Sequence, residues 1–162
     1  MSILNNLAHS NIGWLHIIFS LASLWFGTTI LLKPKGTLSH KRIGYLYAVA
    51  MLGVNATAFL IYHLFGRFGP FHIAAVVSSL TLLAGMIPVF FRSRIKAWFN
   101  FHMSFMYYSV IGLYAAFASE IIVRIPGIRF WWSVLAATML VMLVAMVLFR
   151  KLSPRWSAKF GN

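Results

Sequence analysis

The sequence predicts an all-α integral membrane protein with five transmembrane helices. Of its 162 residues, 61% are hydrophobic and only 9% are charged, whereas soluble domains carry about 25% charged residues. The charged residues also gather in short clusters that separate long apolar runs. Since such a chain has too few charges to solvate a globular surface, its apolar runs are expected to cross a lipid bilayer.

The uncharged runs set the lengths of the expected helices. Each run is long enough for the roughly 20 residues that a helix needs to cross the hydrocarbon core. The helices are expected over about residues 11–32, 40–64, 71–91, 98–123 and 129–149. They account for nearly all of the chain, so residues 1–162 are expected to form a single transmembrane domain.

Helix-breaking residues support these boundaries in order. They are, along the chain, Pro34 and Gly36, then Gly66, Gly69 and Pro70, then Pro126 and Gly127. Thr37 or Ser39 can cap the second helix, and Pro88 lies in the last turn of the third, where it can introduce a kink. Five elements joined by short turns follow from this pattern.

The distribution of Lys and Arg predicts the orientation. Eleven basic residues lie on one side of the expected membrane: Lys33, Lys35, Lys41, Arg42, Arg92, Arg94, Lys96, Arg150, Lys151, Arg155 and Lys159. The other side holds three: Arg67, Arg124 and Arg129. The positive-inside rule therefore places the N-terminus outside the cell and the C-terminus in the cytoplasm.

Composition excludes several kinds of chemistry. The chain has no Cys, no Asp and a single acid, Glu120, which rules out disulfides, thiolate nucleophiles, iron–sulfur clusters, carboxylate dyads and carboxylate cages for Mg²⁺ or Ca²⁺. The formal charge of +13 does not indicate nucleic-acid binding, because the basic residues lie in the clusters between spans.

Six histidines are the most informative residues in this apolar chain. Four of them, His16, His40, His72 and His102, fall one on each of four consecutive expected helices, near the outer, inner, outer and inner ends. Ionisable residues within membrane spans are rare and usually functional. An imidazole near an interface can also simply reach the headgroups, and this reading is preferred for His40.

An internal similarity indicates a repeat. LHIIFSLASL from Leu15 aligns with FHIAAVVSSL from Phe71 at a constant offset of 56, which superposes His16 on His72. His40 and His102 are each followed five residues later by a tyrosine. The sequence therefore predicts a four-helix bundle of two pseudo-repeated hairpins plus a fifth helix, although chance similarity between apolar segments is an equal alternative.

The first functional hypothesis is transmembrane electron transfer by b-type haem. In a pseudo-symmetric bundle, His16 and His72 would form a ligand pair in one leaflet, and His40 and His102 a pair in the other. The arrangement is similar to that of the di-haem, ascorbate-reducible cytochrome b family, which also takes single histidines from four helices. That likeness is one of arrangement only.

Two alternatives stay open. A Zn or Cu site at the outer face could be formed by His16, His72 and Glu120 with His63 nearby, for metal-dependent catalysis or metal handling; Glu120 could instead pair with Arg124 one turn later. The second alternative is a non-catalytic accessory or transport subunit, which could act as a homodimer or within a larger membrane complex. Whether the protein is an enzyme is left open.

Other polar side chains are expected to be structural. Asn55 and Thr57 on the second helix more often bond across helices than to a substrate. Tyr107, Tyr108 and Tyr114 are better explained by core packing than by a quinone or haem pocket.

The stretches HKRIGYLY (His40 to Tyr47) and FHMSFMYYSVIGLYAAFASEIIVR (Phe101 to Arg124), with Leu15-His16 and Pro70-Phe71-His72, resemble a family of predicted bacterial multi-pass membrane proteins that carry a domain of unknown function. The resemblance covers about residues 12–126. It implies the bacterial inner membrane as the setting and singles out five residues: His16, His40, His72, His102 and Glu120. His9 and His63 are peripheral to the pattern, and the family supplies no chemistry.

Overall fold

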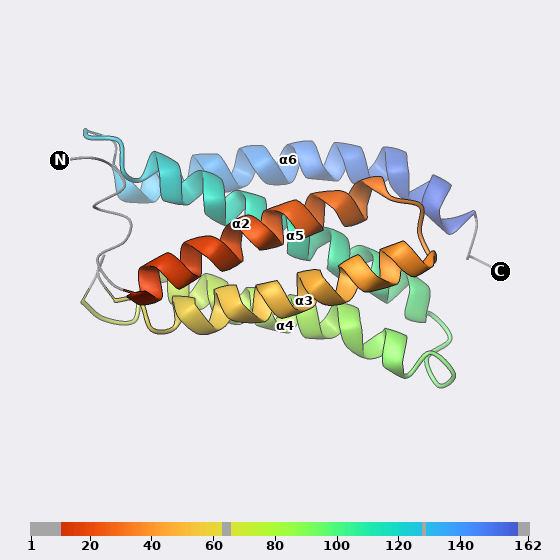
Figure 1. Cartoon of the computed structure of the whole chain (residues 1–162). Helices are drawn as coiled ribbons and strands as arrows, with labels where there is room; N and C mark the ends of the chain where they lie inside the picture. Colours follow the sequence, from red (N-terminus) through yellow and green to blue (C-terminus); the bar gives the residue numbers. More distant parts are fainter. Residues whose placement is uncertain (1–10, 63–65, 128, 159–162) are drawn as a thin grey trace. The chain divides into compact units, whose positions relative to one another are not determined.

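The computed structural model describes residues 11–62, 66–127 and 129–158. Within these ranges the chain is all-helical, with five helices and no strand (Figure 1). The helices are α2 (Asn11–Leu32), α3 (Leu38–Ala58), α4 (Pro70–Phe90), α5 (Trp98–Ile122) and α6 (Phe130–Ser157). The expectation of five helices joined by short connections is confirmed for this part of the chain.

Four of these helices are long and apolar enough to cross a membrane: α2, α4, α5 and α6. The exception among the described helices is α3, which begins with the polar run Ser39 to Arg42 and ends with Asn55 and Thr57. Its lower hydropathy follows directly from those residues. A fifth crossing by α3, and the orientation of the termini, therefore stay predictions.

The second helix was predicted to run to residue 64, but α3 ends at Ala58. The backbone N–H groups of Leu60 and Ile61 donate to the carbonyls of Thr57 and Ala58, which are i→i+3 bonds that tighten and close the last turn. At its start, α3 is capped by Thr37, whose hydroxyl accepts from the backbone N–H of His40 at 3.1 Å. The prediction that Thr37 can act as this cap is confirmed.

The last helix is longer than predicted. It was expected to stop near residue 149, before Arg150, yet α6 continues through Arg150 and Pro154 to Ser157. Charged residues limit the part of a helix that lipid can surround, whereas a helix in water can contain them freely. The prediction therefore took the end of the uncharged run for the end of the helix.

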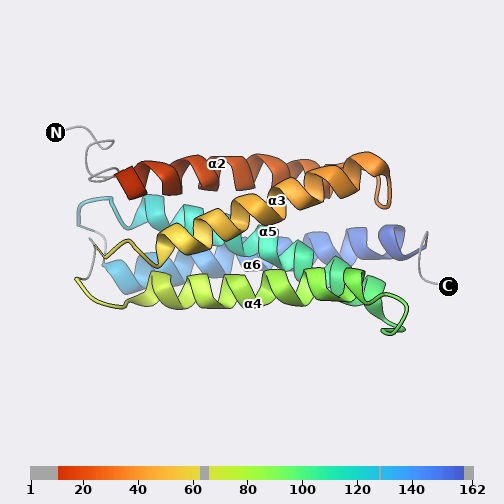
Figure 2. The same cartoon turned by 60° about the horizontal axis from the view of Figure 1, so that its bottom comes forward.

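The chain divides into two compact units, Met1–Leu80 and Thr81–Asn162. In the first unit, α2 and α3 run antiparallel and pack along each other (Figure 2). One close contact involves Gly53 on α3, where a Cβ atom would lie 2.6 Å from the ring of Phe19. The absence of a side chain at Gly53 leaves room for that ring against α3.

In the second unit, α5 packs against α6, and the C-terminal part of α4 contacts α5. The buried hydroxyl of Tyr107 donates a hydrogen bond of 2.7 Å to the carbonyl of Ala145. Around it lies an aromatic cluster with Tyr108, Phe149 and Trp156, at ring-centroid distances of 5.4, 4.9 and 6.0 Å from Tyr107. Tyr107 therefore packs in the core, as the sequence predicts.

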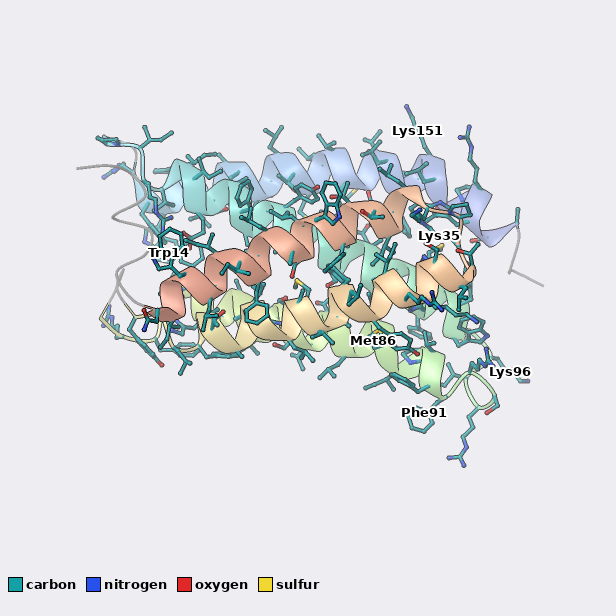
Figure 3. The ribbon with its side chains drawn as sticks, in the orientation of Figure 1. Trp14, Lys35, Met86, Phe91, Lys96 and Lys151 are labelled. Carbon is teal, nitrogen blue, oxygen red and sulfur yellow. The ribbon has the colours of Figure 1, made fainter. Side chains whose placement is uncertain are left out.

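Lys35 closes the C-terminal end of α2. Its ammonium group donates to the carbonyls of Ile30, Leu31 and Lys33 at 2.7, 2.9 and 3.2 Å, which otherwise lack intrahelical donors. Figure 3 shows Lys35 at this end of α2 and Trp14 at the other. Partial burial lowers the pKa of Lys35 from its usual 10.5 to about 8, because desolvation disfavours the charged form.

Candidate functional site: two histidines bonded to neighbouring helices

His16, on α2, is held by a threonine of the neighbouring helix. Its Nδ1 atom lies 2.8 Å from the hydroxyl oxygen of Thr57 on α3. The Thr57 hydroxyl donates its only proton back to its own helix, to the carbonyls of Gly53 at 2.7 Å and Val54 at 3.0 Å. With that proton directed to the carbonyls, the hydroxyl oxygen is left to accept from His16, so we assign the ring proton to Nδ1 and the lone pair to Nε2.

The placement of Thr57 follows from local sequence. A threonine within a helix commonly bonds to the carbonyl one turn earlier, and this turns the hydroxyl oxygen toward α2. The close contact of Phe19 with Gly53 sets the register of the two helices one turn away. The expectation that Thr57 bonds across helices is confirmed.

His102, on α5, has a comparable arrangement in the second unit. Its Nδ1 atom lies 2.8 Å from the backbone carbonyl oxygen of Gly85 on α4. A carbonyl oxygen can only accept, so Nδ1 carries the proton and Nε2 the lone pair. At Gly85 a Cβ atom would lie 2.8 Å from the sulfur and 3.2 Å from the backbone nitrogen of Met106; glycine thus permits the helix contact that brings this carbonyl to His102.

His72, in the first turn of α4, is arranged in the opposite way. Its Nδ1 atom accepts a hydrogen bond of 3.1 Å from the backbone N–H of Gly69, which leaves the ring proton on Nε2. His72 is 4% exposed, and its ring contacts the rings of Tyr62 and Phe68, at centroid distances of 4.5 and 4.9 Å. His72 is therefore a hydrogen-bond donor through Nε2, and the prediction that it pairs with His16 as a ligand does not fit this arrangement.

The remaining predicted pair joins His40 and His102. His40 lies half-buried in the first turn of α3, in the first unit, where its backbone N–H bonds to Thr37. His102 belongs to the second unit, so the pairing stays a prediction. The symmetry expected from the repeat also stays a prediction; His16 and His72, which it would make equivalent, have different partners.

Glu120 forms an ion pair with Arg124 one helical turn later, and Arg124 also donates to the Glu120 backbone carbonyl. Both side chains are about one-third exposed. This is the i,i+4 ion pair that was predicted as the alternative to a ligand role of Glu120.

The predicted zinc or copper cluster gains no support from the geometry. In the part of the chain that the structure describes, no group of three or more His, Cys, Asp or Glu side chains lies close enough to hold a metal ion. His63, named as a nearby ligand, and His9 lie outside the described residues. Glu120 is already engaged by Arg124.

Two residues that complete these arrangements were not predicted as functional. Thr57 was expected to bond across helices but not to a histidine, and Gly85 was not singled out. Neither the register of two packed helices nor the rotamer of a histidine can be read from one sequence, although a glycine in an apolar helix is a signal for close helix packing.

Comparison with models of known protein families, with curated proteins and with solved structures finds no match to this chain. The resemblance to bacterial multi-pass membrane proteins therefore stays an expectation.

Proposed function

We propose that this chain is a membrane-embedded b-type haem protein that transfers electrons, with His16 and His102 as axial ligands. One observation carries the proposal: in each of two separate units, a histidine of an apolar helix donates its Nδ1 proton to an acceptor on a neighbouring helix. Histidines that bind metals almost always donate their other ring N–H to a carbonyl, carboxylate or similar acceptor. The bond selects the tautomer and fixes the ring orientation.

The ligand set differs from the one that the sequence predicts. From the sequence prediction alone, His40 is kept as the second ligand of the haem at His102, and the exposed Lys41 and Arg42 beside it suit the propionates. His72 is left out because its Nδ1 is occupied as an acceptor. A haem at His16 would therefore be held by this one residue of the chain. Bound haem would supply one-electron redox chemistry.

The setting is proposed from the apolar helices and the charge pattern. Four helices suit contact with lipid, and the excess of basic residues in the loops expected on one side favours an N-terminus outside the cell. The bacterial inner membrane is proposed from the resemblance to bacterial multi-pass membrane proteins. Crossing of the membrane by α3 belongs to this proposal too.

The decisive experiment is an absorption spectrum of the full chain purified in detergent from haem-replete cells, first oxidised and then reduced with dithionite. We expect a Soret band and, on reduction, the sharp α and β bands of a low-spin haem. His102→Ala is expected to remove the low-spin bands, and His16→Ala the high-spin component. Protein without a Soret band overturns the proposal.

Glu120→Gln is the matched control. It removes the charge of the single acid of the chain and leaves both histidine arrangements untouched, so its haem spectrum is expected to equal that of the wild type. Elemental analysis of the same samples separates the alternatives: stoichiometric zinc or copper that is lost in Glu120→Gln would replace the haem proposal by the metal site.

A further inference from the structure

The Nε2–H group of His72 is a buried donor that the proposed haem sites do not use. The atom has no hydrogen-bond partner in the described structure, and the residue is 4% exposed. A buried donor without an acceptor costs free energy comparable to a lost hydrogen bond. An acceptor that reaches this atom would recover that cost.

The contacts that His72 makes in the structure do not require the proton on Nε2. A phenylalanine ring could make the same contacts with Tyr62 and Phe68, and the side-chain carbonyl of an asparagine could accept the bond from the Gly69 N–H. Both replacements would avoid the buried Nε2–H. Its presence in the first turn of α4 therefore indicates a ligand that contributes the acceptor.

The chain offers only one carboxylate side chain as an acceptor. It contains no Asp, and its single acid is paired with Arg124. The donor lies in the first turn of a long helix, where the helix dipole favours partial negative charge. A polar, electron-rich oxygen from outside the chain fits both conditions.

The surroundings of His72 indicate the shape of that ligand. Two aromatic rings contact the imidazole, tilted by 38° for Tyr62 and 32° for Phe68. Tyr62 and Phe68 are themselves 43% and 55% exposed, so each retains an accessible aromatic surface. Flat, conjugated molecules stack on such surfaces at centroid distances of about 4.5–7 Å.

We propose that His72, with Tyr62 and Phe68, forms a binding site for the head group of a quinone. A quinone carbonyl oxygen accepts from His72 Nε2–H while the quinone ring stacks on the flanking aromatic side chains. Quinones are lipid-soluble, so they reach a protein of apolar helices from within the bilayer. The site goes beyond the haem proposal and does not depend on it, because none of its three residues is a proposed haem ligand.

The test uses the full chain in detergent and the short-chain quinone 2,3-dimethoxy-5-methyl-1,4-benzoquinone as the probe. Binding is measured by calorimetry, and the side-chain ¹⁵N resonances of histidine-labelled protein are followed during the titration. We expect saturable binding with a shift of the His72 Nε2 resonance. His72→Phe is expected to weaken binding about tenfold, the loss of one hydrogen bond, whereas His72→Gln, which keeps an N–H donor, stays within about threefold of the wild type.

His16→Phe is the matched control, because it makes the same change of side chain at a histidine outside the site. It should abolish the haem signal of His16 and leave quinone affinity unchanged. Equal affinity of His72→Phe and the wild type would overturn the quinone site, as would a His72 resonance that does not respond. If His72→Phe does not fold, the resonance and His72→Gln decide the result.

The outcomes also separate the two proposals. Colourless protein that binds the probe refutes the haem proposal alone, and coloured protein that does not bind it refutes the quinone site alone. A His72 shift produced by phospholipid before any quinone is added would assign the acceptor to a lipid phosphate and overturn the quinone site.

Discussion

The Nδ1 atom of His102 lies 2.8 Å from the carbonyl oxygen of Gly85, at a point where α4 and α5 are in close contact. The contact depends on the missing side chain of Gly85, since a Cβ atom there would lie 3.2 Å from the backbone nitrogen of Met106. In the second unit, the packing of α4 against α5 therefore also determines which ring nitrogen of His102 carries the proton.

Gly85→Ala should separate α4 from α5 and weaken the bond to His102. The sulfur of Met106 can move aside, but its backbone nitrogen can move only with α5, so we expect a loss of about 1–3 kcal/mol of stability together with less haem bound per chain. Thermal unfolding and the Soret absorbance measure the two effects. Gly112→Ala is the control, because a Cβ atom there meets nothing within 4 Å; equal behaviour of the two variants would contradict the coupling.

Thr57→Val should release the ring of His16. Valine has nearly the shape of threonine but no acceptor for Nδ1–H, so the ring loses its fixed orientation, and mutations of such supporting groups typically cost 10–100-fold in metal affinity. The haem dissociation rate of the His16 site should rise accordingly. Thr57→Ser restores the hydroxyl and is expected to recover most of the affinity. Two equally impaired variants would show that Thr57 acts only through packing.

Gly53→Ala should disturb the contact between α2 and α3. The added methyl group would lie 2.6 Å from the ring of Phe19, so the ring must move, and overpacking of this kind typically costs about 1–3 kcal/mol. Gly44→Ala on the same helix, where a Cβ atom meets nothing within 4 Å, provides the baseline in thermal unfolding. The double variant Gly53→Ala with Phe19→Leu replaces the phenylalanine ring by a smaller side chain and should recover part of the lost stability.

Tyr107→Phe should destabilise the pairing of α5 with α6. It removes the hydrogen bond to the Ala145 carbonyl and keeps the aromatic packing, so the expected loss is about 0.6 kcal/mol, the average for such bonds between membrane helices. Tyr108→Phe removes a neighbouring hydroxyl for which the described structure shows no hydrogen bond, and should change the unfolding free energy less. The reverse order would show that the Tyr107 hydroxyl does not stabilise the pair.

Lys35 should make stability depend on pH above neutrality. Its pKa is about 8 in the folded chain against 10.5 for an ordinary lysine, so between these values the unfolded chain binds more protons, and stability rises as pH rises. Below pH 8 both states are protonated and this contribution is constant. The difference in thermal stability between wild type and Lys35→Met, followed from pH 7 to 10, measures the effect; a difference that falls across this range would contradict the lowered pKa.

The sequence predicted elements more completely than it predicted contacts. Uncharged runs located all five helices, because membrane spans need long apolar segments, and the i,i+4 spacing already indicated the pair of Glu120 with Arg124. The end of α3 was missed, since closure of its last turn by Leu60 and Ile61 has no compositional signal. The roles of His16 and His72 could not be distinguished either. Each depends on which atom lies opposite Nδ1, and that is set by helix register and ring rotamer.

The composition of α3 has a consequence for how the protein is assembled. After Arg42 the helix continues for only about 24 Å at 1.5 Å per residue, less than the roughly 30 Å of the hydrocarbon core, and that part still contains Asn55 and Thr57. Such a segment partitions poorly from the translocon into lipid by itself. With α2 alongside, the His16–Thr57 bond satisfies one of its polar groups before it meets lipid. We therefore expect α2 and α3 to enter the bilayer together as a helical hairpin, so that deletion of α2 during biosynthesis would leave α3 outside the membrane.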